Sequence, residues 1–189
     1  MGSERFLATD IVKQQLDDAS YFLGAAMPRV FREVVAAEFT NGQHDALESP
    51  LEAAFAVWWH AITIADYPLA ALRLKQQRDV RIGDRTYRID FVVDCNAFIG
   101  PVGHKYPVRR PKIAIELDGH AFHERTKEQV ALRNQRDRDL QLDGWSVFHI
   151  SGSEFYQFPA KCTSDVYAES FKLLKTWWRQ CLLWEPHAG

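Results

Sequence analysis

Two carboxylates at the end of a short apolar segment are the residues best suited to chemistry in this chain. Residues 112–123 read KIAIELDGHAFH, and strand alternation places Glu116 and Asp118 on the face opposite Ile113 and Ile115. Two carboxylates on an otherwise apolar strand are unfavourable unless a cation or a protonated partner compensates them. A divalent metal ion is the usual partner, so this segment is a candidate edge of a metal site.

Another acidic residue interrupts an upstream run, RTYRIDFVV at residues 85–93. Asp90 lies among β-branched and aromatic residues, where aspartate is disfavoured. Taken alone, it could equally be an edge-strand residue that pairs with Arg88 or with a loop amide. With Glu116 on the next strand, a functional role becomes the better interpretation, and we expect both carboxylates within reach of one metal ion. Alternation predicts that Tyr87, Ile89, Phe91 and Val93 share the opposite face.

The overall composition is that of an ordinary globular domain. The 189 residues are 47% hydrophobic and 25% charged, which fits one domain with a proper core. The net charge of -2 does not indicate nucleic acid, so any phosphate-binding surface must be local. Three cysteines without paired spacing favour a reducing compartment, and no apolar run approaches the roughly 18 residues of a membrane span. With no signal-peptide pattern, we expect a soluble, cytoplasmic protein without a membrane partner.

Hydrophobic periodicity and capping signals predict the elements that position these residues. One helix has Ser49 as N-cap, Pro50 at its first position and Glu52 three residues after the cap. The order helix, strand, strand, strand, helix, strand is typical of an α/β layer with a mixed sheet. We expect residues 1–48 to form a helical extension packed on a domain of residues 49–189. The other predicted elements are a helix at 9–39 with a break near Pro28, strands at 72–80, 85–95 and around Glu116, a helix at 124–142, a strand at 145–150 and a helical tail to 184.

This order and these residues resemble the PD-(D/E)XK nuclease superfamily, whose restriction-endonuclease-like fold has an αβββαβ core. Glu52, Asp90 and residues 116–118 fall at its acidic positions on the first helix, the second strand and the third strand. The superfamily's lysine, which helps to orient or activate the attacking water, is replaced here by Asp118. More closely, residues 49–154 look like the small endonucleases related to very-short-patch repair enzymes. The residues that carry this closer likeness are 115–119 (IELDG), His123, Arg136, Asp137, Leu140, Gly144, Trp145 and Val147.

The resemblance implies a metal-dependent endonuclease that hydrolyses phosphodiester bonds, with DNA a better expectation than RNA. Asp90, Glu116 and the Leu117 carbonyl are the implied ligands, and such hard oxygen donors suit Mg²⁺ or Mn²⁺ better than Zn²⁺. Asp118 is expected to join the same ion or to hold a second one through water. Glu52 either belongs to the metal shell or caps its own helix by reaching back to the Ser49 amide.

Histidine and basic residues supply the remaining candidates. His123, like His120, either relays a proton near neutral pH or is a loop histidine bonded to backbone. Arg133 and Arg136 lie within one helical turn, and one of them either replaces the missing lysine or belongs to a solvated helix face. The loop before the Glu116 strand concentrates positive charge for contact with backbone phosphates. Its candidate nucleic-acid-binding residues are Lys105, Arg109 and Arg110.

Two other readings remain open. The chain is either a nuclease-like module without catalysis, which binds nucleic acid or a protein partner, or a structural α/β protein whose acidic residues are all ion-paired. The missing lysine favours the first of these, whereas the pair of Asp90 and Glu116 favours the enzyme. An endonuclease that cuts palindromic sites would require a homodimer, and the exposed side of the last helix could provide the dimer interface.

Overall fold

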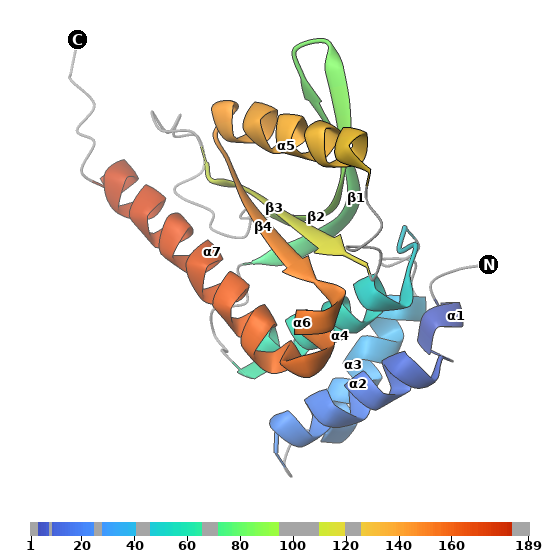
Figure 1. Ribbon diagram of the computed structural model, residues 1–189. Coiled ribbons are helices and arrows are strands. Elements are labelled where there is room, and N and C mark those ends of the chain that lie inside the picture. Colours follow the sequence, from blue (N-terminus) through green and yellow to red (C-terminus); the bar gives the residue numbers. More distant parts are fainter. Residues whose placement is uncertain are drawn as a thin grey trace.

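A four-stranded mixed sheet with strand order β1-β2-β3-β4 forms the centre of the molecule (Figure 1). The computed structural model describes residues 4–7, 9–24, 28–40, 46–65, 72–94, 110–119 and 126–182. The predicted α/β class with a mixed sheet and added helices is confirmed. The elements are α1 (Glu4–Leu7), α2 (Asp10–Phe22), α3 (Pro28–Thr40), α4 (Pro50–Ala65), β1 (Arg73–Ile82), β2 (Arg85–Asp94), β3 (Lys112–Asp118), α5 (Lys127–Leu142), β4 (Trp145–Ser151), α6 (Gly152–Gln157) and α7 (Pro159–Leu182).

Both kinds of strand pairing occur in this sheet. β1 and β2 form an antiparallel hairpin through a two-residue turn, in which Gly83 adopts the positive φ of 61° that its place in the turn requires. β2 pairs with β3 antiparallel, with Phe91 opposite Ile115. β3 and β4 run parallel, with Glu116 opposite His149, and α5 is the crossover that a parallel pair needs. The hairpin extends past α5 at the top of Figure 1.

Helices cover both faces of the sheet (Figure 1). On one face, Phe91, Ile113 and Ile115 pack in a core shared with α4, α6 and α7. On the other face, Leu140 of α5 packs against a smaller cluster that includes Ala114. The sheet therefore has an apolar contact on each side.

The central helix α4 is buried on every side rather than on one stripe, because α2 packs against the surface that the sheet and α7 leave open. Ala53, Ala56 and Val57 are fully buried, as is the larger Phe55. The indole N–H of Trp58 donates to Gln15 of α2 at 2.7 Å. The N-terminal helices thus share one core with the sheet.

Local signals explain most of the helix boundaries. The predicted long N-terminal helix is two helices: α2 ends at Phe22, and α3 begins at Pro28. The predicted tail is also divided, since Ser151 caps α6 through the N–H of Glu154 and α7 begins at Pro159. Within the described ranges, no helix is both long enough and apolar enough to cross a bilayer.

The predicted alternation along β2 was wrong at two residues, Tyr87 and Ile89: the Tyr87 hydroxyl donates to Asp139 of α5 instead of facing the main core. Phe91 and Val93 face the main core as expected, but Ile89 packs in the α5-side cluster together with Val92. The β1–β2 ladder passes from Gln76–Phe91 to Arg78–Ile89 and leaves one position unpaired. At that position Gln77 has a φ of 43°, which bulky L-residues rarely adopt. The local change of backbone direction turns the outer half of the hairpin, and Ile89 with it, toward α5.

Candidate functional site

The structure brings Asp90 and Glu116 together on the α5 side of the sheet. Continuing the register from Phe91 and Ile115 places the two residues opposite each other on β2 and β3. The backbone N–H of Leu117 donates to Asp90 Oδ2 at 2.8 Å, which fixes the Asp90 carboxylate where the β1–β2 ladder is interrupted. Both carboxylates, Leu117 and Asp118 line one cavity of about 740 Å³.

Two arginines of α5 also line this cavity. Arg136 Nη1 lies 3.1 Å from Glu116 Oε2, and Arg133 Nη2 lies 2.7 Å from Asp118 Oδ2. The i,i+4 pair of Arg133 and Asp137 is present as well, at 3.9 Å. Arg133 and Arg136 therefore do not form a merely solvated face, because their guanidiniums point back at the β3 carboxylates.

His149 of β4 lies beside these ion pairs. Its Nε2 lies 3.1 Å from Asp137 Oδ2, and its Nδ1 lies 3.6 Å from Asp118 Oδ2. Burial, more than any neighbouring charge, lowers the pKa of His149, and Arg133 adds to this effect while Asp137 opposes it. The imidazole is therefore neutral at pH 7 and does not balance the nearby carboxylates.

The cluster holds more negative than positive groups. We call these four carboxylates and two guanidiniums the carboxylate cluster: Asp90, Glu116, Asp118, Asp137, Arg133 and Arg136. Burial raises the pKa of Glu116 to about 8, with Arg136 opposing the shift and the other carboxylates adding to it. Burial also raises the pKa of Asp90, although the Leu117 amide partly offsets it. The cluster thus favours an added cation or a bound proton at neutral pH.

The hydrogen bonding of Glu116 leaves room for that cation. The side chain of Glu116 is 7% exposed, and its Oε1 forms no hydrogen bond within the described part of the chain. A buried carboxylate oxygen without a donor is unfavourable unless a cation occupies the position. Asp90 and Glu116, with the Leu117 carbonyl, provide the hard oxygen donors that Mg²⁺ or Mn²⁺ would use.

Among the described residues, no group of three His, Cys, Asp or Glu side chains is placed to hold a metal ion. Mg²⁺ retains several waters and is commonly bound through only one or two carboxylates.

Glu52 acts in the cap of its helix. Ser49 accepts the Glu52 backbone N–H at 3.2 Å, and its hydroxyl donates to Glu52 Oε1 at 2.8 Å. The amide that reaches Glu52 Oε2 is that of Glu48, at 3.0 Å, one residue earlier than expected. The negative charge of Glu52 contributes to the raised pKa of Asp90, so this cap lies beside the carboxylate cluster.

Gln77, which the sequence did not single out, joins this cap to the hairpin. Its Nε2 donates to Glu52 Oε2 at 2.8 Å, and its Oε1 accepts from Arg88 Nε at 2.7 Å. Arg88 also pairs with Glu48, which closes a ring of four residues. We call this the Glu52 ring: Glu48, Glu52, Gln77 and Arg88. It holds β1 in place where the ladder opens beside Asp90.

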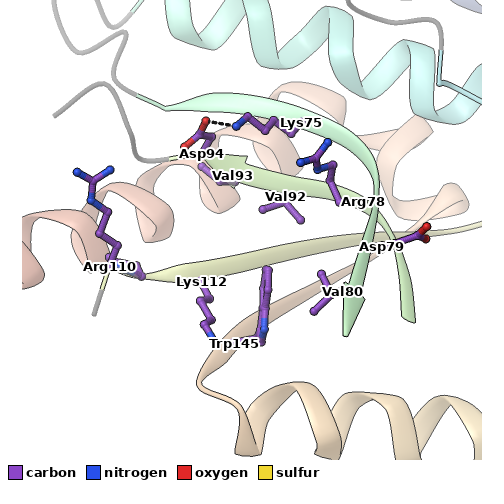
Figure 2. A pocket seen from close by; sticks show the side chains of 11 residues that line it. Lys75, Arg78, Asp79, Val80, Val92, Val93, Asp94, Arg110, Lys112 and Trp145 are labelled. Carbon is purple, nitrogen blue, oxygen red and sulfur yellow. Dashed lines mark ion pairs between the residues drawn. The ribbon is translucent and has the colours of Figure 1, made fainter. Parts of the chain in front are cut away.

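Most of the other predicted residues are not described by the structure. His120, His123, Lys105 and Arg109 lie outside the described residues. Arg110 and Lys112, which end the basic loop predicted to border the carboxylates, instead line a second cavity of about 630 Å³ at the start of β3 (Figure 2). Their predicted roles remain predictions.

The comparisons with known proteins add no relative. No family model, no curated protein and no solved structure matches this chain. The class of protein that the fold defines is an α/β protein with a four-stranded mixed sheet, and its activity must be argued from the cluster itself.

Proposed function

We propose that this protein is a metal-dependent endonuclease that hydrolyses phosphodiester bonds of DNA. The observation that carries the proposal is the excess of buried carboxylates at the end of β3. Asp90 and Glu116 meet on adjacent strands, and one oxygen of Glu116 has no hydrogen-bond donor among the described residues. The resemblance to the PD-(D/E)XK superfamily, which places acidic residues at these positions, supports the same activity.

The bound ion would be held by Asp90, Glu116 and the Leu117 carbonyl. Bound there, Mg²⁺ or Mn²⁺ supplies a water of lowered pKa and neutralises charge on the phosphoryl oxygens. The protein's own contribution is the shape and charge of the cavity. Burial on the α5 side of the sheet holds the carboxylates rigidly, because Leu117 fixes Asp90 and β3 lies between two paired strands.

The α5 arginines would bind the substrate. In this structure Arg136 pairs with Glu116, and Arg133 pairs with Asp118. Both guanidiniums line the cavity, where they would bind the phosphate oxygens of a substrate strand with planar, bidentate geometry. Arg136 would supply the charge that the absent motif lysine provides. The lowered pKa of His149 keeps a neutral imidazole nearby as a proton acceptor.

The same ion pairs favour a second candidate function, a module that binds nucleic acid or a protein partner without cleavage. In that case the arginines neutralise the carboxylates permanently, and the missing lysine reflects lost catalysis. Purely structural ion pairing predicts, in addition, no affinity for divalent ions. Metal-dependent cleavage separates the three possibilities.

The experiment is incubation of the purified protein with labelled single- and double-stranded DNA and RNA, with Mg²⁺, Mn²⁺ or EDTA. We expect cleavage of DNA only with a divalent ion, and its loss in Glu116→Gln, which keeps the shape but removes the charge. Asp118→Asn should reduce the rate less if Asp118 holds only an outer-shell water. Glu169→Gln, on the exposed side of α7, is the matched control that leaves the rate unchanged.

The outcomes are distinct. If Glu116→Gln keeps full metal-dependent activity, the site lies elsewhere or the activity belongs to a contaminant. If the wild type binds DNA and cuts none of the four substrates with any ion, the binding module replaces the enzyme.

A further inference from the structure

The second cavity lies on the α5 side of the sheet, at the opposite end of β3 from the carboxylate cluster. Its volume is about 630 Å³, and β1, β2, β3 and the start of β4 contribute its walls (Figure 2). Four basic side chains line it, against two acidic ones. The basic residues are Lys75, Arg78, Arg110 and Lys112, and the acidic residues are Asp79 and Asp94.

Ion pairs balance two of the four positive charges: Lys75 pairs with Asp94 at 2.5 Å, and Lys112 pairs with Asp143 at 2.7 Å. Figure 2 shows the Asp79 carboxylate turned away from Lys75 and Arg110. The guanidinium of Arg78 has no ion-pair partner in the described part of the chain. An exposed arginine at the mouth of a cavity with surplus positive charge is suited to a phosphate group.

The apolar part of the lining suits a planar group. Val80, Val92 and Trp145 lie close together in Figure 2 and pack in the α5-side cluster. The Trp145 indole is fixed, because its N–H donates to Asp143 Oδ2 at 3.1 Å and the Lys112 ammonium lies 5.8 Å from its ring centre. Lys112 is in turn held by Asp143 at 2.7 Å. A rigid aromatic ring beside aliphatic side chains is a surface on which a nucleobase stacks.

The distance to the carboxylate cluster is compatible with one nucleic-acid strand. Lys112 and Glu116 are four residues apart on β3 and lie on the same face, which corresponds to about 13 Å at roughly 3.3 Å per residue. A duplex strand advances about 3.4 Å along the axis per phosphate. The two cavities are thus a few nucleotides apart along one strand.

We infer that the second cavity binds one nucleotide of the substrate strand, with the base against Trp145 and Val92 and the phosphate at Arg78. The inference rests on the proposed function, which it deepens by assigning a substrate-positioning site away from the carboxylates. Arg110 and Lys112 complete the positive rim. The cavity orients the strand and takes no part in bond cleavage.

The test measures binding separately from cleavage. Fluorescence anisotropy with a labelled 12-nucleotide DNA, single-stranded and duplex, is recorded in EDTA over a series of salt concentrations. Arg78→Gln should weaken binding and reduce the salt slope by about 1. Arg81→Gln is the matched control: Arg81 is equally exposed on β1 but bonds the Gly83 carbonyl and lies outside both cavities, so its slope and affinity stay unchanged.

Substitutions of Trp145 test the base contact. Trp145→Leu should weaken binding roughly 5- to 100-fold, the range expected for one stacked base, whereas Trp145→Phe keeps most of the affinity. Inorganic triphosphate is the competitor that carries charge without a base. If it displaces the DNA as well as an unlabelled trinucleotide does, the cavity recognises charge alone and the assignment of a base is wrong.

The results also separate this inference from the proposed function. Equal affinity and salt slope for the wild type, Arg78→Gln and both Trp145 variants overturn the nucleotide site, even if Glu116→Gln abolishes cleavage. Weaker binding in Arg78→Gln and Trp145→Leu, with no cleavage by the wild type, keeps the nucleotide site and refutes the nuclease. Thermal unfolding shows whether each variant is folded. If Trp145→Leu is not folded, the binding of Arg78→Gln alone decides whether the nucleotide site exists.

Discussion

We predict that replacement of Glu116 by glutamine changes how the stability of the protein depends on pH. The Glu116 carboxyl is buried beside Asp90 and Asp118, and only Arg136 opposes the resulting rise of its pKa. Glutamine has nearly the same shape and resembles the protonated acid. We therefore expect the wild type and Glu116→Gln to be about equally stable at pH 4.5 and to diverge as the pH rises.

The sign and the magnitude follow from proton linkage. The pKa of Glu116 rises from the ordinary 4.5 to about 8 on folding, so between these values the folded protein binds more protons than the unfolded chain. The stability that this carboxyl contributes is fully present below pH 4.5 and is lost as the pH rises through 8. At about 1.4 kcal/mol per pH unit, the wild type loses roughly 3 to 5 kcal/mol across the window, whereas Glu116→Gln keeps it.

Urea unfolding in EDTA, followed by circular dichroism from pH 5 to pH 8.5, measures this difference. Parallel curves for the two proteins would refute the argument, because they would mean that Glu116 has an ordinary pKa in the folded state. Addition of Mg²⁺ at pH 8 should then stabilise the wild type and leave Glu116→Gln unchanged. If Mg²⁺ stabilises both proteins equally, or neither, the ion does not bind at Glu116, although the pH argument stands.

Two further substitutions test the supports of the site. Ser49→Ala removes the cap that accepts the Glu52 amide and should lower the free energy of unfolding by about 1 kcal/mol, measured by urea titration; an unchanged midpoint would show that the cap is dispensable. Leu140→Ala deletes the fully buried side chain by which α5 packs on the sheet, and should lower stability by roughly 2 to 5 kcal/mol. Because α5 carries Arg133 and Arg136, the substitution should also loosen their pairs with the β3 carboxylates. Since Arg136 opposes the rise of the Glu116 pKa, NMR titration should then show a still higher pKa for Glu116. Leu142→Ala, on the exposed end of α5, is the control that changes neither quantity.

The sequence predicted the elements whose signals are local. Alternation along β3 placed Glu116 and Asp118 on the face away from Ile113 and Ile115, and the structure agrees. The Ser49 and Pro50 signals located the start of α4, because caps depend on a few consecutive residues. The meeting of Asp90 with Glu116 could be anticipated because both strands alternate and β2 precedes β3 in the predicted order.

Features that depend on distant contacts could not be anticipated. A sequence does not predict a positive φ at a glutamine, because this backbone conformation is typical of glycine and asparagine. The position of Ile89 on the α5 side of the sheet was therefore not predicted. The pairing of Arg133 with Asp118 depends on where α5 lies over β3, and helical periodicity does not predict that position. The second cavity joins Arg78 to Trp145 across three strands, and only the assembled sheet reveals it.

The Glu52 ring has a consequence for how this sequence can vary. Each member bonds two others, and Glu48 reaches Glu52 through its backbone N–H. Loss of the Glu52, Gln77 or Arg88 side chain therefore leaves two neighbours without a partner. Effects of substitutions in such a network do not add, and coupling energies of about 0.5 to 3 kcal/mol are typical. We therefore expect substitutions in the Glu52 ring to occur together as sequences diverge, because the ring joins α4 to the β1–β2 hairpin.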